Sequence, residues 1–276
     1  MSTNNSIKDI NEFIDNGSIT SQQILVVSLC FIFNMLDGFD ITAMAVVASP
    51  VSVDLALTPD LLGWIFSFAL AGMMVGAMAL APIADIIGRR ALIILSLMIV
   101  GISVIMTSKV ESLTPFMLLR FISGMGAGAL LASQASLAAE YSPDKYRALS
   151  VAIVTAGYPT GAMMTSVVAG YILPEYGWRM MFLFGGVVTV SMVIVAWLMI
   201  PESLKYLIEK KPNNALEKIN KILLKLNAPS INELPPSNND REVTVSMIGN
   251  MRMLLSPKFR RLSLMLWTSF FCAFGT

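Results

Sequence analysis

Long runs of apolar residues, separated by short polar segments, make up most of the first 200 residues of this chain. Each run is close to the length of about 20 residues that a helix needs to cross the hydrocarbon core of a membrane. Thr20 and Gln23, just before the first run, have the spacing of a capping box and predict a helix start there. The pattern predicts six membrane-spanning helices, over residues 24–49, 61–84, 91–108, 113–139, 148–173 and 180–200.

Two polar segments and a further apolar run lie outside these six helices. Residues 1–23 are polar, with their few apolar residues on one helical face, so we expect this segment to lie on the membrane surface. Residues 201–261 are polar and basic, and they predict an amphipathic stretch over 203–226 that Pro212 interrupts. Residues 262–276 are apolar again but too few to cross a membrane. We therefore expect a seventh helix that is cut short, in a chain that is part of a longer protein.

The distribution of Lys and Arg between the loops predicts how the chain crosses the membrane. Of 19 basic residues, only Lys109 and Arg179 fall in one set of loops, and Arg120 lies within a predicted helix. The others fall in the N-terminal segment, in the alternate loops and in the 201–261 segment. Because basic loops stay in the cytoplasm, we expect a cytoplasmic N-terminus and a cytoplasmic central loop.

Composition supports membrane insertion and excludes several classes of function. The 276 residues are 55% hydrophobic and 13% charged, whereas soluble domains carry roughly 25% charged residues. The net charge of +1 provides no basic field for nucleic acid, and the chain has no histidine and two cysteines far apart. The sequence contains no metal-ligand cluster, dinucleotide fingerprint, nucleophile elbow or ATP-binding loop. It therefore predicts neither an enzyme nor a cofactor-binding protein, and any energy that the protein uses would have to come from an ion gradient rather than from ATP.

Three charged residues fall inside the predicted helices. Asp37 and Asp40 are three residues apart in the first helix and therefore share a face, just beyond the middle of the membrane. Arg120, in the fourth helix, lies at a depth similar to that of Asp40, roughly 10 to 14 Å from the non-cytoplasmic surface. A charge inside the membrane costs a few kcal/mol, so each of the three is a candidate for function. We expect them to share one cavity.

These charges suit the binding of an anion together with a proton. Arg120 can hold a carboxylate through two parallel hydrogen bonds. Without histidine, Asp37 and Asp40 are the deep groups able to carry a proton. The alternative is an ion pair that serves helix packing alone. Three polar residues within the helices, Asn34, Gln134 and Tyr158, are further candidates for the lining of the cavity.

The loop after the second helix carries a motif known from a transporter superfamily. Its Asp85-x-x-Gly88-Arg89-Arg90 core resembles the major facilitator signature G-x-L-a-D-r-x-G-r-r/k, with Ala81 for the first glycine and Ile86 for a basic residue. In this motif Asp85 is placed to cap a helix N-terminus, and Gly88 permits the turn. The superfamily's other patterns are matched by Arg120-x-x-x-Gly124-x-Gly126-x-Gly128, Glu140-x6-Arg147, Gly177-Trp178-Arg179 and Pro201-Glu202-Ser203. The resemblance implies a charged cytoplasmic gate formed by Asp85, Gly88, Arg89, Arg90, Glu140 and Arg147.

Within that superfamily, Asp37-Gly38-Phe39-Asp40 resembles the D-G-x-D motif of the aromatic acid:proton symporters. The resemblance covers nearly the whole chain but only the N-terminal half of such a carrier. It implies import of a ring-derived acid, such as benzoate, a hydroxybenzoate or muconate, with a proton across the bacterial inner membrane, where it serves aromatic catabolism. It implies that Asp37 and Asp40 couple the proton and that Arg120, with Asp40, binds the acid. It further implies a monomeric full-length carrier whose partners are the acid anion, the proton and the lipid bilayer.

The expected fold is an all-α integral membrane bundle of six helices, arranged as two inverted repeats of three, followed by a cytoplasmic loop and the start of a seventh helix. Two other functions are compatible with this arrangement of helices. Sugar porters share the Asp85–Arg90 loop and the Pro-Glu-Ser end of the sixth helix, and a sensor derived from the fold would not transport at all. The D-G-x-D motif and Arg120 favour an organic acid over a sugar. The charges retained inside the membrane favour a carrier over a sensor.

Overall fold

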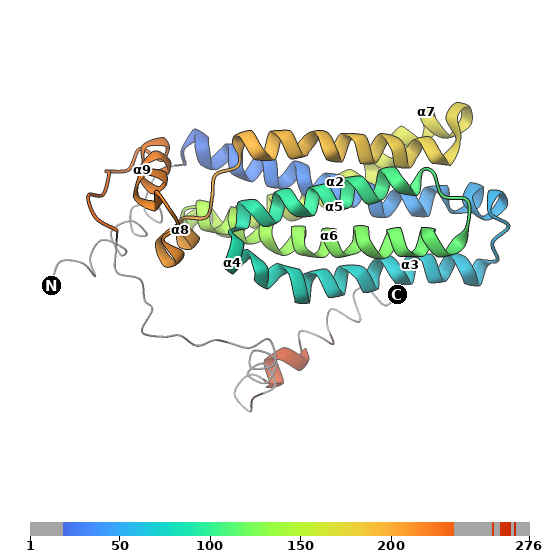
Figure 1. The fold of residues 1–276 in the computed structure, drawn as a ribbon, viewed down its shortest axis with the longest axis horizontal. Coiled ribbons are helices and arrows are strands. Elements are labelled where there is room, and N and C mark those ends of the chain that lie inside the picture. Colours follow the sequence, from blue (N-terminus) through green and yellow to red (C-terminus); the bar gives the residue numbers. More distant parts are fainter. Residues whose placement is uncertain (1–18, 235–255, 257–259, 266–267, 269–276) are drawn as a thin grey trace. The chain divides into compact units, whose positions relative to one another are not determined.

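The computed structural model describes residues 19–234, 256, 260–265 and 268, and within these ranges the regular elements are helices (Figure 1). The chain divides into two compact units, Met1–Ser237 and Asn238–Thr276. The predicted surface segment over residues 1–23 lies almost wholly outside the described residues, as does most of the predicted seventh helix. Residues 260–265 are helical.

Five helices in the described part of the chain are long and apolar enough to cross a membrane. They are α2 (Ser21–Asp54), the segment Pro59–Ile87 that contains α3 and α4, α5 (Arg89–Thr107), α6 (Leu113–Tyr141) and α7 (Asp144–Met199). With 56 residues, α7 is about 84 Å long, which is enough for two crossings. Its backbone leaves helical geometry at Gly177, where φ is 71°. The fifth and sixth predicted spans are thus two arms of one interrupted helix.

The first helix begins where its capping residues predict. The Thr20 backbone N–H donates to Gln23 Oε1 at 2.8 Å, and the Gln23 backbone N–H donates to Thr20 Oγ1 at 3.4 Å. This reciprocal pair confirms the capping box. The helix runs further than the apolar pattern predicts, through Pro50 to Asp54.

The second span is not one uniform helix. It consists of α3 (Pro59–Val75), a π-helical turn (Gly76–Leu80), a 3₁₀ turn (Ala81–Ile83) and α4 (Ala84–Ile87). Pro82 lies in the 3₁₀ turn, and its missing N–H interrupts the regular α-helical hydrogen bonding there. Hydrophobicity alone does not reveal these changes of winding, because the residues of the π-helical and 3₁₀ turns are as apolar as those of α3.

The helices pair in a defined way along the bundle: α2 packs mainly on α7, α3 on α6, and α5 on both α6 and α7. Glycines allow the closest of these approaches. A Cβ added at Gly72 of α3 would collide with the carbonyl oxygen of Phe121, and one added at Gly128 of α6 would collide with that of Met73. The backbones of α3 and α6 are therefore in direct contact, as is common for helices packed within membranes.

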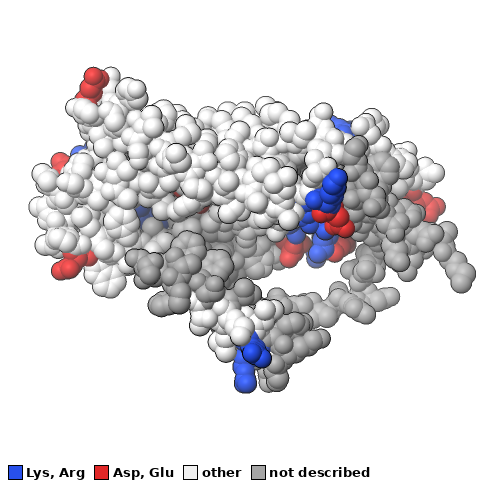
Figure 2. Space-filling view, turned by 180° about the vertical axis from the view of Figure 1, so that it is seen from behind, with Lys and Arg blue, Asp and Glu red and all other residues white. Residues whose placement is uncertain are grey.

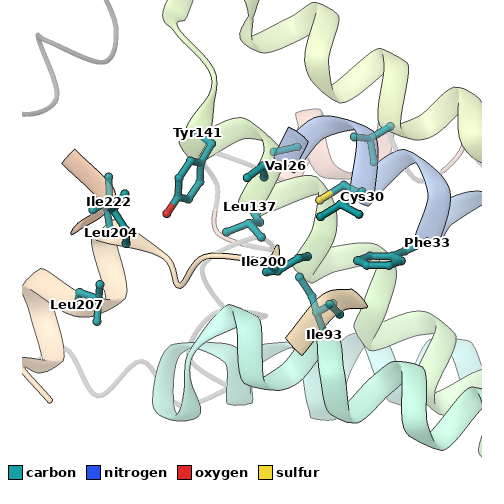
Figure 3. Close-up of a cluster of buried hydrophobic side chains, with 14 of the residues drawn as sticks. Val26, Cys30, Phe33, Ile93, Leu137, Tyr141, Ile200, Leu204, Leu207 and Ile222 are labelled. Atoms are coloured by element: carbon teal, nitrogen blue, oxygen red, sulfur yellow. The ribbon is translucent and has the colours of Figure 1, made fainter. Parts of the chain in front are cut away.

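Two short helices, α8 (Leu204–Lys210) and α9 (Ala215–Lys225), follow α7 at one end of the bundle, here called the α8–α9 end (Figure 1). Pro212 lies between them, at the break that the sequence predicts. Leu207 of α8 and Ile222 of α9 join a buried cluster that includes Val26 of α2 and Leu137 of α6 (Figure 3). This part of the polar 201–261 segment is therefore packed onto the bundle.

Charged side chains are distributed as a membrane-embedded bundle requires. On the face shown in Figure 2, the flanks of the helices carry almost no Lys, Arg, Asp or Glu at the surface, and charges gather toward the ends of the bundle. Large apolar side chains such as Met74, Ile194 and Trp197 are more than half exposed. An uncharged, apolar flank is the surface that lipid tails would cover.

Candidate functional site

One side of α2 carries a buried polar stripe. Asn34, Asp37 and Asp40 follow one another at intervals of three residues, so they lie on one side of the helix. Their exposed fractions are only 2%, 2% and 6%, although this helix is apolar over most of its length. The stripe therefore faces the interior of the bundle.

Arg120 of α6 lies against this stripe and forms a buried ion pair. Its Nη1 is 3.0 Å from Asp40 Oδ1, and the two side chains are 2% and 8% exposed. Its Nη2 donates to Thr107 Oγ1 of α5 at 3.4 Å. Its guanidinium carbon lies 4.9 Å from the centroid of the Phe182 ring of α7, a cation–π distance. Side chains of three other helices therefore hold Arg120.

The bonding of this cluster is incomplete. Arg120 Nε and both carboxylate oxygens of Asp37 have no hydrogen-bond partner among the described residues. An unpaired polar atom buried away from water costs roughly 1 to 3 kcal/mol, and more when it is charged. Native proteins keep few such atoms without a reason. The cluster thus has a free donor on a cation and free acceptors on an acid, which a ligand and a proton could use.

The three other polar candidates differ in what they contact. Asn34 Nδ2 donates to the carbonyl oxygen of Val154 at 2.6 Å, which ties α2 to α7. Both amide atoms of Gln134 are buried without a partner among the described residues, as is Asn34 Oδ1. Tyr158 is partly exposed. Its backbone carbonyl oxygen lies so close to Gly38 that a Cβ added at Gly38 would collide with it. Hence Asn34 and Tyr158 take part in packing α2 against α7, while the amide group of Gln134 remains unbonded.

A cavity of about 170 Å³ adjoins the ion pair. Asp40 and Arg120 form part of its wall, and residues of α2, α3 and α6 form the rest. Met44, Phe66 and Met73 are among the apolar side chains of that wall. The ion pair is therefore in contact with a space that is large enough for a small organic molecule.

A second charged cluster lies at the α8–α9 end, where the superfamily motif predicts a gate. Arg89 Nη2 is 2.9 Å from Glu140 Oε1, which connects the start of α5 to the end of α6. Ser203 Oγ donates to Glu140 Oε2 at 2.6 Å. The Arg89 and Glu140 side chains are 15% and 20% exposed. The structure thus brings these two predicted gate residues together and adds Ser203 to them.

Glu202 completes this cluster, and the sequence analysis gave it no role. Its Oε1 accepts hydrogen bonds from the backbone N–H of Arg90 at 3.1 Å and from that of Ser203 at 3.0 Å. Its carbonyl oxygen accepts from Tyr141 Oη at 2.7 Å. We call Arg89, Arg90, Glu140, Tyr141, Glu202 and Ser203 the α5 N-terminal network.

Glu202, and not Asp85, binds the N-terminus of α5. Asp85 is exposed in the first turn of the short helix α4, whereas Glu202 binds the first turn of α5. Gly88 has a φ of 99°, and a Cβ added there would lie 2.5 Å from Glu202 Oε2. Glycine at this position therefore provides the turn and also leaves room for the carboxylate. The N-terminus of a helix favours negative charge, which explains why a glutamate is suited to it.

Two predicted gate residues, Arg90 of this network and Arg147 outside it, make further bonds to backbone carbonyl oxygens. The Arg90 guanidinium donates to the carbonyl oxygen of Trp197 near the end of α7. Arg147 forms an exposed ion pair with Asp144 and donates from Nε to the carbonyl oxygen of Ala139 at 3.2 Å. Arg147 therefore fastens the loop between α6 and α7.

A third polar contact, at the opposite end of the bundle, was also missed. Asp54, at the end of α2, accepts from Arg179 in an ion pair and from Trp178 Nε1 at 3.2 Å. Arg179 also donates to the carbonyl oxygen of Val110 at 3.2 Å. Trp178 packs edge-on against Phe182, the ring beneath Arg120. The only sequence signals were the Gly-Trp-Arg motif and an acidic residue just after an apolar run.

No group of three or more His, Cys, Asp or Glu residues in the described part of the chain is arranged to hold a metal ion. The chemistry available near Arg120 is therefore that of a buried cation, two carboxyl groups and an adjoining apolar cavity. Such a site can bind an anion and accept or release a proton, but it offers no activated nucleophile.

Comparisons with known proteins show the family of this chain. The family model of the Major Facilitator Superfamily matches residues 30–276. The 4-hydroxybenzoate transporter PcaK of Acinetobacter baylyi is 27% identical over 271 residues, which are 98% of this chain and 59% of the relative. The gallate transporter of Pseudomonas putida is 27% identical over 95% of this chain and 58% of its own length. The chain thus spans a little over half the length of these curated relatives.

Solved structures show the same fold. The proton:xylose symporter XylE bound to 6-bromo-6-deoxy-D-glucose superposes with a TM-score of 0.68 at 18% identity, over 75% of this chain and 50% of that one. The family membership and the names of the relatives agree with the expectation that the protein is not an enzyme. The all-α membrane fold expected from the sequence is confirmed. By the match of its residues 30–276, this chain belongs to the major facilitator superfamily and is part of a multi-pass membrane protein.

Proposed function

We propose that the full-length protein is a proton-coupled secondary transporter that imports an aromatic or ring-derived organic acid anion by alternating access. The observation that carries this proposal is the buried Arg120–Asp40 pair in the wall of a cavity, together with an Arg120 Nε–H that has no partner among the described residues. A carboxylate is the ligand that suits a guanidinium edge, since it accepts two parallel hydrogen bonds. The relatives named for 4-hydroxybenzoate, gallate and benzoate support an aromatic acid as the ligand.

In this proposal, Arg120 binds the carboxylate and releases part of its bond to Asp40. Asp40 and Asp37 carry the proton, because both are buried acids and Asp37 has no partner that would compete for it among the described residues. Gln134 contributes an unbonded amide, and Asn34 and Tyr158 hold α2 against α7. Linking proton and anion in one cluster allows the charge inside the membrane to stay nearly constant through the cycle.

The α5 N-terminal network, with Asp85, Gly88 and Arg147, is proposed as the cytoplasmic gate. Its ion pair and hydrogen bonds join the ends of α5, α6 and α7, and its partial exposure allows water to replace them when the gate opens. The excess of Lys and Arg at this end supports a cytoplasmic location for the N-terminus and for α8 and α9. The bacterial names of the curated relatives support the inner membrane as the site of action.

Uptake by the full-length protein in proteoliposomes tests the proposal. We expect accumulation of radiolabelled 4-hydroxybenzoate under an imposed inward proton gradient and collapse of that accumulation by a protonophore. Benzoate should compete, whereas benzamide and benzyl alcohol should not, because they cannot replace a carboxylate on Arg120. Equal competition by benzamide would contradict anion binding. Preferential competition by a sugar would favour the sugar-porter alternative, and absence of any uptake would favour the sensor.

A further inference from the structure

The cavity beside the ion pair lies where two helix pairs of the bundle separate. Because α2 packs mainly on α7 while α3 packs on α6, α2 and α3 have little contact with each other. The space that remains between α2, α3 and α6 is the cavity of about 170 Å³. It is therefore a consequence of the helix pairing rather than of a missing side chain.

The cavity is polar at one part of its wall and apolar over the rest. Asp40 and Arg120 supply the charges, and Ser123, whose hydroxyl donates to the Arg120 carbonyl oxygen at 3.2 Å, is the other polar residue of the wall. From α3 come Phe66, Leu70 and Met73. This is the distribution that an amphiphilic ligand needs, with an anionic group at one side and a hydrocarbon body at the other.

The volume matches one aromatic ring. An apolar cavity of roughly 150 Å³ in another protein binds benzene, so a cavity of about 170 Å³ accommodates a single ring. The wall formed by α3 and α6 is stiff, because their backbones touch: a Cβ added at Gly124, itself a residue of this wall, would collide with the carbonyl oxygen of Ala69. This part of the wall therefore cannot move easily to admit a second fused ring.

We infer that this cavity is the subsite for the ring of the transported acid, and that Phe66, Leu70 and Met73 of α3 determine which ring sizes are accepted. The inference rests on the proposed function, in which Arg120 binds the carboxylate of the same molecule. A Phe side chain interacts favourably with a second ring in tilted or offset geometry, and a Met sulfur interacts favourably with a ring edge. Neither α3 nor these three residues were candidates in the sequence analysis.

The decisive experiment compares two phenylalanines on α3 in the full-length protein purified in detergent. Phe66 lines the cavity, whereas Phe68 packs against Trp64 and Phe121, with ring centroids 6.4 Å apart in both pairs. Dissociation constants for benzoate and 2-naphthoate are measured by calorimetry for wild type, Phe66→Ala and Phe68→Ala. The ratio of the two constants is the readout, because it cancels effects on Arg120 and on the folded fraction.

We expect wild type to prefer benzoate. Phe66→Ala should weaken benzoate binding about tenfold through loss of the ring contact, and should shift the ratio toward 2-naphthoate by a similar factor. Phe68→Ala should leave the ratio unchanged.

A second variant fills the cavity with a larger side chain. Ala127→Leu, also in the cavity wall, should weaken benzoate binding at least about tenfold with Arg120 and Asp40 intact. If Ala127→Leu does not fold, the ratio of the benzoate and 2-naphthoate dissociation constants in Phe66→Ala is sufficient to test the inference.

The outcomes separate the ring subsite from the proposed function. If wild type binds benzoate but Phe66→Ala leaves the ratio unchanged, or Phe68→Ala shifts it equally, the ring binds elsewhere and this inference is wrong while the proposed function stands. If wild type binds neither aromatic acid while the purified protein is folded, the proposed function fails and the subsite with it.

Discussion

Two charged clusters of this bundle contain the same types of side chain but differ in how completely those side chains are bonded. Around Arg120, one ion pair and one long hydrogen bond leave Arg120 Nε and both oxygens of Asp37 without partners among the described residues. In the α5 N-terminal network, Glu140 bonds to Arg89 and Ser203, and Glu202 bonds to two backbone N–H groups.

The difference indicates different roles. A buried polar network that is fully bonded fixes one arrangement of the chain, whereas one that is partly bonded carries a cost that a ligand or a proton can remove. The α5 N-terminal network is therefore suited to hold helix ends together. The Arg120 cluster is suited to bind. Substitutions in the two clusters should consequently affect different measurements.

The largest loss of uptake is expected for Asp40→Asn. This variant leaves the Arg120 charge buried without its counter-ion, which costs about 3 to 5 kcal/mol when one partner of a buried pair is removed. It also removes a titratable group. We expect uptake driven by a proton gradient to fall to background, measured in proteoliposomes with radiolabelled acid. Asp60→Asn, at an exposed position at the start of α3, is the matched control. Unchanged uptake that still collapses with a protonophore would exclude Asp40 from proton coupling.

Arg120→Lys should have a smaller effect, which is a loss of affinity for benzoate without a loss of folding. The ammonium keeps the charge that balances Asp40 but cannot present two parallel hydrogen bonds to a carboxylate. Loss of a charge-assisted hydrogen bond costs roughly 1.5 to 3 kcal/mol, so the dissociation constant for benzoate should rise about ten- to a hundredfold. Calorimetry measures it, with the unfolding temperature as the check on folding. Near-normal affinity would show that Arg120 serves only as an ion-pair partner in packing.

The α5 N-terminal network, in which Glu140 and Glu202 both have bonding partners, should respond through stability rather than binding. Glu202→Ala removes the acceptor of two backbone N–H groups at the start of α5 and before α8, a loss typical of a helix cap at about 0.5 to 2 kcal/mol. We expect a lower unfolding temperature and an unchanged dissociation constant for benzoate. Glu209→Ala, at an exposed position of α8, should change neither quantity. Loss of benzoate binding in Glu202→Ala would place the network in the binding site and contradict the different roles of the two clusters.

The smallest effect is expected on the outer surface of α9. Glu217 pairs with Lys221 at 2.7 Å, with both side chains largely exposed. The hydrogen bond from Lys221, and then its charge, lower the pKa of Glu217 from its usual value of 4.5. A carboxyl with a lowered pKa stabilises the fold above its usual pKa and loses that contribution as the pH falls through the lowered value.

Because water and salt screen this exposed pair, Glu217→Gln should leave the unfolding temperature at pH 7 unchanged within error. Thermal unfolding at pH 7 and pH 3.5 measures this. If Glu217→Gln lowered the unfolding temperature at pH 7 as much as Glu202→Ala does, the exposed pair would contribute as much to stability as the α5 N-terminal network.

Several features follow from local patterns and were predictable. Apolar runs of membrane-spanning length locate the long helices, because backbone polar groups in lipid must be bonded within a helix. Thr20 and Gln23 mark a helix start because their bonds are local. The depths of Asp40 and Arg120 follow from the constant rise of a helix, so their neighbourhood could be anticipated. The role of these residues in transport stays a prediction.

The set of helices, their approximate depth and the buried charges could therefore be predicted, since all of them depend on spacing along one chain segment. The rotation of each helix about its axis depends instead on how the helices pack. Helices that are apolar on nearly every side carry no pattern that specifies this rotation. Hence Thr107 and Phe182 around Arg120, Glu202 at the start of α5 and Phe66 in the cavity wall could not be chosen beforehand. Each acquires its role from contact with a residue of another helix, and close packing between helices brings the two together.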